Sequence, residues 1–197
     1  MHGELSDQDF LQRFDPILQT FHSRKRRLEN YAEILARLYP PNVDHSRRKI
    51  LEIASGCDVF PALLRSKGYD AIGLEASPLV VRYCRIKNIK LISPETWDAP
   101  AWTQERFDIV VLISFITGPT EGEWAKRMRT RLCENISDQI RKGSDFLLFD
   151  LRWFDSIMEE FAKLDLMKNI DARKKRIKRI EFYLLTLRSC KEASARL

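Results

Sequence analysis

One stretch decides the fold of this 197-residue chain: Lys49-Ile50-Leu51-Glu52-Ile53-Ala54-Ser55-Gly56-Cys57-Asp58. An aliphatic run with one acidic residue ends at small residues, and the apolar residues that follow, Phe60, Leu63 and Leu64, have helical spacing. The pattern predicts a strand, a tight turn and a helix. Small residues let a ligand approach the backbone, and the unpaired N–H groups that open a helix are donors for it. The turn is therefore a candidate ligand-binding site.

Strands and helices alternate along the chain after this turn. Strands are expected at 50–54, 71–75, 89–92, 107–113 and 146–151, and helices at about 58–67, 78–87, 121–140 and 154–163. Short links between such elements predict an α/β fold with a doubly wound, mostly parallel sheet. The end of the chain differs, because a strand at 164–170, the basic run 171–179 and a strand at 181–188 follow without a helix. We therefore expect seven strands, of which the last is antiparallel.

The residues before the first strand predict helices. Ser6-Asp7-Gln8-Asp9 resembles a capping box with Asp in place of the usual Glu, and apolar residues then recur at helical spacing to Phe21. A second apolar stripe runs from Leu28 to Leu38 before Tyr39-Pro40-Pro41 ends it. The sequence predicts a helical N-terminal extension at 1–48 and an α/β domain at 49–197.

Composition limits the compartment and the kind of site. Four widely spaced cysteines and three histidines argue for reduced thiols and against a zinc site or a disulfide framework. The polar start predicts no secretory signal, and no apolar run approaches the ~20 residues that a membrane span needs. We expect a cytoplasmic protein without a membrane partner. The net charge of +6 is concentrated at the basic C-terminal end.

The motifs, taken in this order, resemble those of class I (Rossmann-like) S-adenosylmethionine-dependent methyltransferases over about residues 50–188. Leu51–Asp58 is similar to the family's first motif, an acidic residue in the first strand followed by a glycine-rich turn. Gly73–Pro78 resembles the second motif, and 107–114 resembles the motif of the fourth strand. Residues 95–97 occupy the place where this family commonly contacts adenine.

This resemblance implies S-adenosyl-L-methionine as cofactor. The implied cofactor-binding residues are Glu52, Ala54, Ser55, Gly56, Glu75, Ala76, Ser77, Glu95, Thr96, Trp97, Ile113 and Ser114. In the family pattern, Glu75 would bind both ribose hydroxyls, and the turn would hold the methionine end with Glu52 as a water-mediated partner of its ammonium group. No metal is implied. No catalytic residue is assigned, because alignment does much of the work in an in-line methyl transfer.

The turn departs from the family pattern at two positions. The family usually has glycine where this chain has Ala54 and Asp58, so only the central Gly56 remains. Two roles for Asp58 are open at this point: its side chain would either crowd the methionine end of the cofactor or cap the next helix. The functional expectation depends on which of the two holds.

The expected function is an enzyme that transfers a methyl group to a small molecule, RNA or protein, with 1–48 as a lid or acceptor wall. The alternative is a catalytically inactive methyltransferase-like adaptor that binds RNA or a protein through its basic C-terminal region. The basic run 173–179 is either a solvated loop or a rim beside the active site that attracts an anionic acceptor. A nicotinamide-dependent dehydrogenase fits poorly because G-x-G-x-x-G is missing. The oligomeric state cannot be inferred from the sequence.

Overall fold

The computed structural model describes residues 5–18, 25–41, 48–93, 104–113, 123–149, 154–164, 170–177 and 180–187. Its helices are α1 (Asp7–Leu18), α2 (Lys25–Leu38), α3 (Val59–Ser66), α4 (Pro78–Ile86), α5 (Glu123–Arg141) and α6 (Phe154–Lys163). Its strands are β1 (Lys49–Ile53), β2 (Asp70–Leu74), β3 (Leu91–Ile92), β4 (Ile109–Leu112), β5 (Asp145–Leu148), β6 (Ile170–Ile177) and β7 (Ile180–Leu187). The predicted alternation of strands and helices after residue 48 is confirmed.

The seven strands form one sheet in the order β3-β2-β1-β4-β5-β7-β6. Strands β1 to β5 pair in parallel, whereas β7 is antiparallel to both β5 and β6. The sheet therefore has the predicted fold class, a doubly wound and mostly parallel sheet with an antiparallel last strand. The chain winds outward in both directions from β1 and β4, and ligands of open α/β sheets bind where the strand order reverses, at the carboxyl ends of the strands.

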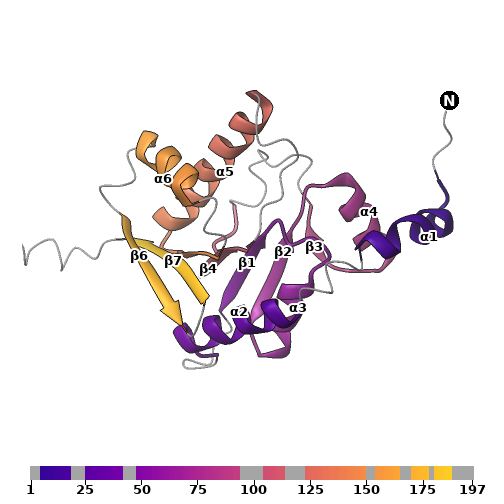
Figure 1. The fold of residues 1–197 in the computed structure, drawn as a ribbon, viewed down its shortest axis with the longest axis horizontal. Helices are drawn as coiled ribbons and strands as arrows, with labels where there is room; N and C mark the ends of the chain where they lie inside the picture. Colours follow the sequence, from indigo (N-terminus) through magenta and orange to yellow (C-terminus); the bar gives the residue numbers. More distant parts are fainter. Residues whose placement is uncertain are drawn as a thin grey trace, which may run out of the picture.

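Helices cover both faces of this sheet. Figure 1 shows α5 and α6 over one face and α2 and α3 over the other, while α1 and α4 lie beyond the β3 end. Successive side chains of β1 alternate between the two layers, since Leu51 and Ile53 belong to the core under α5 and α6 and Ile50 to the core with α2 and α3. Double coverage explains why the central strands read as continuous apolar runs.

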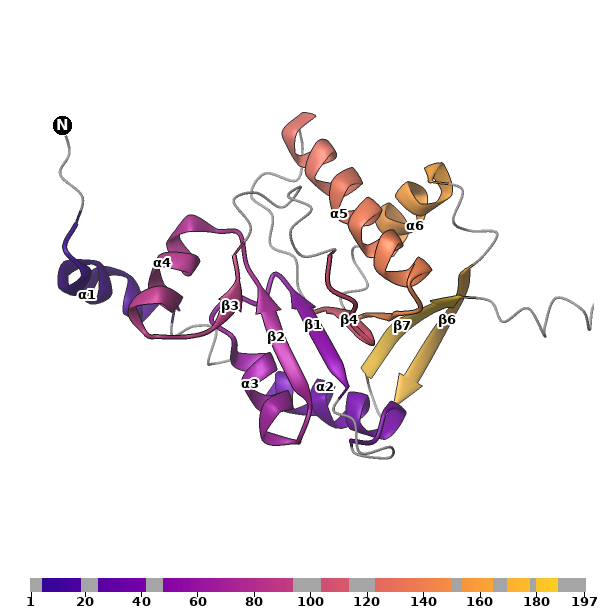
Figure 2. The same cartoon turned by 180° about the vertical axis from the view of Figure 1, so that it is seen from behind.

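The helical N-terminal extension forms two described helices. The Ser6 hydroxyl caps α1 by accepting from the Asp9 amide at 3.2 Å, so the amide half of the predicted capping box forms. The two helices lie in different places, because α2 packs with α3 under the sheet and α1 packs beside α4 (Figure 2). The division into 1–48 and 49–197 stays a prediction.

The basic run near the end of the chain corrects one prediction. Residues 173–177 were expected in a loop, but they form the last five residues of β6, which pairs with β7 along its whole length. The ladder to β7 outweighs the poor strand propensity of consecutive lysines and arginines. β6 is the last strand in the sheet order, and charged side chains are a common protection for such an edge.

Candidate functional site

The turn after β1 lies at the reversal point of the sheet and follows a left-handed backbone path. Its φ angles are 57° at Ala54, 60° at Gly56 and 63° at Asp58. Glycine adopts such angles freely, whereas an L-residue there costs roughly 1–2 kcal/mol. The two positions that depart from the resembled pattern therefore keep a backbone conformation typical of glycine. The substitutions change the side chains of the turn but not the left-handed geometry at these positions.

A glycine on β2 makes room for this turn. Gly73 is the register partner of Glu52 on β1. A Cβ atom built on Gly73 would lie 2.6 Å from the Ser55 Cβ and 2.2 Å from its Oγ. Sequence reasoning did not single out Gly73 as a site residue, although a glycine inside a strand is a signal of close backbone approach.

Glu75 connects the turns that follow β1 and β2. Its side chain is only 5% exposed. Oε2 accepts from the Gly56 amide at 3.0 Å, and Oε1 accepts from the amides of Ala76 at 2.9 Å and Ser77 at 2.8 Å. Burial raises the pKa of Glu75 above its ordinary value, and the three N–H bonds oppose that rise. Because a carboxylate offers about four acceptor positions, about one is left for a ligand.

Asp58 does not play the helix-capping role considered from the sequence. It occupies the N-cap position of α3, yet its side chain makes no capping hydrogen bond. Arg65 instead pairs with both carboxylate oxygens, with an Nη1–Oδ1 distance of 3.2 Å. The same Nη1 donates to the Ala71 carbonyl on β2 at 3.0 Å. The buried Asp58 carboxylate is therefore neutralised by a cation of its own helix and held beside β2.

Glu52 is the third carboxylate around this turn. It is 5% exposed, and its Oε2 has no hydrogen-bond partner among the described residues. Burial raises the pKa of Glu52 well above its ordinary value, and the negative charges of Asp58 and Glu75 raise it further. The buried Oγ of Ser55 also has no hydrogen-bond partner in the described ranges. Unpartnered buried polar atoms are costly, so this part of the turn is better suited to a polar ligand than to an empty interior.

Two buried, unbridged thiols join the turn to α4. The Cys84 thiol donates to the Gly56 carbonyl at 3.8 Å, and Cys57 and Cys84 interact with each other through their thiols. Both pack in one apolar cluster with Phe10 of α1. The turn therefore contacts the N-terminal extension through α4 and this cluster.

The structure brings together most of the residues implied by the resemblance. The described members of that set are Glu52, Ala54, Ser55, Gly56, Glu75, Ala76, Ser77 and Ile113. Ile113 is buried directly after β4, next to β1 in the sheet. The remaining members, Glu95, Thr96, Trp97 and Ser114, lie outside the described residues. Their ligand roles stay predictions.

The described parts of the chain show neither a candidate metal site nor a candidate membrane-spanning helix. They contain no group of three or more His, Cys, Asp or Glu side chains that could hold a metal ion. No helix among them is both long enough and apolar enough to cross a membrane.

The strand order, the antiparallel β7 and the turn at the reversal point define the class I methyltransferase fold. A TehB-like S-adenosylmethionine-dependent methyltransferase from Corynebacterium glutamicum shares this fold at a TM-score of 0.57, with 16% identity over 88% of this chain and 100% of that one. A putative S-adenosyl-L-methionine-dependent methyltransferase from Methanococcus maripaludis has a TM-score of 0.55, with 11% identity over 96% and 98% of the two chains.

A third structure with the same fold is a ribosomal protein L11 methylase from Lactobacillus delbrueckii subsp. bulgaricus. Its TM-score is 0.52, with 10% identity over 84% of this chain and 79% of that one. No protein-family model matches the chain, and no curated protein sequence matches it significantly. The comparisons therefore establish the fold, and the activity has to be argued from the site.

Proposed function

We propose that this protein is an S-adenosylmethionine-dependent methyltransferase. One observation carries the proposal: the turn after β1 keeps three left-handed residues and is bonded through Gly56 to the acidic residue after β2, in a sheet with the class I order. In a protein that no longer used this site, no functional constraint would maintain the strained backbone angles at Ala54 and Asp58. The observed turn keeps them.

The proposed cofactor site extends along the carboxyl ends of β1, β2 and β4. The turn from Ala54 to Gly56 would hold the methionine end, with Glu52 beside the ammonium group. Glu75 would accept from the ribose through its remaining acceptor position, and the segment 75–77 would border the ribose. Ile113 would pack against the cofactor from β4, and Ser114 would follow it. Glu95, Thr96 and Trp97 remain the proposed adenine contacts.

S-adenosylmethionine supplies a methyl group activated by a positively charged sulfonium. The protein's contribution is to bind the cofactor, to orient it for in-line attack by the acceptor and to exclude water from the reacting atoms. Gly56 and Glu75 fix the two turns relative to each other through their hydrogen bond. No described side chain is assigned as a general base, and the need for one depends on the acceptor.

The acceptor is a small molecule, an RNA or a protein, and the basic β6 strand bears on this choice. Arg173 and Lys174 are already paired, with Asp171 at 2.5 Å and Glu181 at 2.9 Å. β6 lies four strands from β1, which corresponds to about 19 Å at the usual strand spacing. Only an extended acceptor would reach both places, so a functional role for the basic run 173–179 would favour a macromolecule.

Transfer of a labelled methyl group tests the activity and classifies the acceptor. The protein is incubated with S-adenosylmethionine carrying a labelled methyl group and an extract of the source organism, treated with ribonuclease, with protease or with neither. We expect label in one product that is absent with Glu75→Ala and present with Glu159→Ala, an exposed position on α6. Loss of label after ribonuclease would identify RNA, and loss after protease would identify protein. No labelled product in any fraction would leave the inactive adaptor as the better description.

A further inference from the structure

Three buried carboxylates surround the turn after β1, and their hydrogen bonds differ. Glu75 accepts three backbone N–H bonds with its two oxygens. Asp58 accepts from the Arg65 guanidinium with both of its oxygens. Both Glu75 and Asp58 are therefore supplied with hydrogen-bond donors in their buried positions.

Among the described residues, Glu52 lacks the hydrogen-bond donors that Glu75 and Asp58 have. Its side chain is 5% exposed, and within the part of the chain that the structure describes its Oε2 has no hydrogen-bond partner. An ionised carboxylate without donors in a buried position costs far more than a neutral carboxyl group. Two neighbouring negative charges add repulsion to that cost. The neutral form of Glu52 is therefore the form that fits these surroundings.

The charged and titratable groups around Glu52 come from three neighbouring parts of the fold. Asp58, just before α3, and Glu75, just after β2, place negative charges near Glu52. Arg65 of α3 pairs with Asp58, and the Cys84 thiol of α4 lies near both of these carboxylates. Arg65 is the one cation in this group, and it is already bound to Asp58 and to the Ala71 carbonyl. No available cation among them compensates a charge on Glu52.

We propose that Glu52 holds a proton in the ligand-free protein and releases it when a cationic amino group binds beside the turn. The step breaks only the O–H bond of the carboxyl group. The proton leaves to solvent, and the positive charge of the bound ammonium group takes its place next to the carboxylate. This inference rests on the proposed function, which supplies that ammonium group as the amino-acid end of S-adenosylmethionine.

Release of the Glu52 proton on binding makes the affinity for the ligand depend on pH. A Glu52 that was already ionised in the free protein would not have this effect. Because one proton leaves for each ligand bound, affinity rises by about tenfold per pH unit while Glu52 is protonated in the free protein. Glu52→Gln imitates the neutral carboxyl group and cannot release a proton. Its affinity for the cofactor should be lower than that of the unmodified protein and independent of pH over the same interval.

The first measurement uses the free protein and needs no ligand. Carbon-13 NMR follows the glutamate carboxyl resonances during a pH titration, and the resonance absent from Glu52→Gln is assigned to Glu52. We expect this resonance to show the protonated form at a pH where ordinary glutamates, with pKa near ~4.3, are already ionised. Titration together with the surface glutamates would overturn the inference.

The second measurement is calorimetry of S-adenosylmethionine binding in two buffers with different ionisation enthalpies, at about pH 6, well above the ~4.3 of a free glutamate. A difference in apparent enthalpy that corresponds to release of up to one proton is expected for the unmodified protein and for Glu159→Gln. Glu52→Gln should show no difference.

Failure of this inference and failure of the proposed function would give different results. Binding without proton release would overturn the inference and leave the proposed function intact. Absence of binding together with a protonated Glu52 in the NMR titration would instead contradict the proposed function. The unmodified chain gives the calorimetric reading by itself, and Glu52→Gln is needed only to assign the NMR resonance.

Discussion

Ala54 and Asp58 hold left-handed backbone angles without being glycine, and this strain is open to direct measurement. Replacing Ala54 with glycine removes roughly 1–2 kcal/mol of strain and adds about 0.4–1 kcal/mol of entropy to the unfolded chain. We predict that Ala54→Gly raises the free energy of unfolding by about 0.5–1 kcal/mol in urea titrations. Ala62→Gly, at an exposed position on α3, should lower it by about 1 kcal/mol. Equal losses in both variants would contradict the left-handed angle.

A substitution at Gly73 should have the opposite effect on the free energy of unfolding, because the space beside this residue is already filled. A methyl group there would meet Ser55 at sub-contact distance. Gly73→Ala should therefore lower the free energy of unfolding by about 1–3 kcal/mol. The double variant with Ser55→Gly should recover a large part of the loss, since both Ser55 atoms that cause the clash are gone. If the two changes were additive, the close approach of β2 to the turn would be wrong.

The raised pKa of Glu52 predicts a pH dependence of stability. The folded protein keeps the Glu52 proton to higher pH than the unfolded chain. Its contribution to stability is therefore complete below the ordinary glutamate pKa near ~4.3 and is lost as the pH rises through the raised folded value. Glu52→Gln removes this loss. Its free energy of unfolding, relative to the unmodified protein, should rise with pH by up to about 1.4 kcal/mol per unit. A constant difference in denaturant titrations across this pH range would contradict the assignment.

At the scale of elements, α1 is held against α4 by a compact set of contacts. The Arg82 guanidinium lies 4.5 Å from the ring centroid of Phe10 and donates to Asp7 at 3.1 Å, and the Tyr83 hydroxyl donates to Asp15 at 2.9 Å. Phe10 is buried in the cluster that contains Cys57 of the turn. The docking of α1 and the position of the turn therefore share one apolar core.

Because α1 and the turn share this core, we expect a substitution in α1 to destabilise the turn as well. Phe10→Ala removes a buried ring, at a cost of about 3–5 kcal/mol where the site cannot collapse. We expect faster hydrogen exchange of the amides in α1 and, to a lesser degree, in residues 54–58. Gln12→Ala, at an exposed position of the same helix, should leave both unchanged. Faster exchange in α1 alone would show that the turn is independent of the extension.

β6 shows where reasoning from sequence fails at this scale. Its residues 173–176 are all basic, without the apolar alternation by which a strand is recognised. The strand exists because β7 offers a complete antiparallel ladder, a partner that a local pattern does not reveal. Arg173 pairs with Asp171, two residues earlier on the same strand, and Lys174 pairs with Glu181 across the β6–β7 ladder.

Over the whole molecule, the doubly wound and mostly parallel sheet could be predicted because each central strand is a continuous apolar run and each link is short. Glu52, Gly56 and Glu75 could be placed together, since the carboxyl ends of neighbouring parallel strands meet at one edge. The partners of these residues could not be predicted. Arg65 neutralises Asp58 and Gly73 accommodates Ser55 only through the packing of α3 and β2 against the turn. Such contacts depend on tertiary geometry and not on spacing in the sequence.

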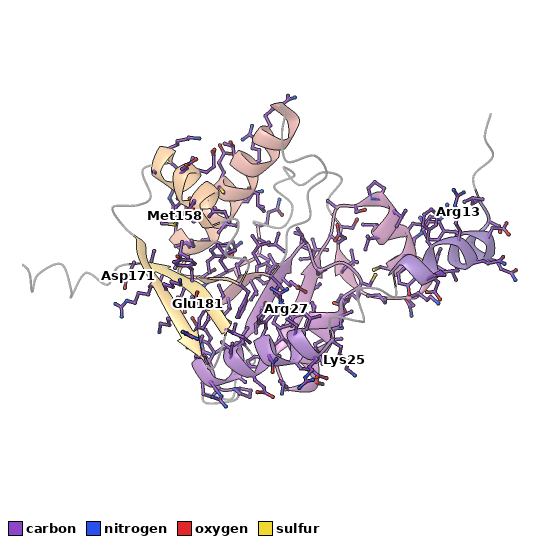
Figure 3. All side chains as sticks on the ribbon, in the orientation of Figure 1. Arg13, Lys25, Arg27, Met158, Asp171 and Glu181 are labelled. Carbon is purple, nitrogen blue, oxygen red and sulfur yellow. The ribbon has the colours of Figure 1, made fainter. Side chains whose placement is uncertain are left out.

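The two ends of the molecule are far apart, with Arg13 on α1 beyond the β3 edge and Asp171 on β6 at the opposite edge (Figure 3). The proposed cofactor site lies between them at β1 and β2. The proposed cofactor site therefore belongs to this middle region and includes neither α1 nor β6. Binding of S-adenosylmethionine to the whole chain is its most direct consequence.

Calorimetric titration of the folded protein with S-adenosylmethionine tests the proposed cofactor site. We predict saturable binding at one site per chain, weakened by at least about 100-fold, or roughly 2.7 kcal/mol, in Glu75→Ala and unchanged in Glu159→Ala. Unchanged affinity in Glu75→Ala would show that the ribose site is misplaced. No binding up to about 1 mM by protein whose fold is verified by circular dichroism would contradict the account as a whole.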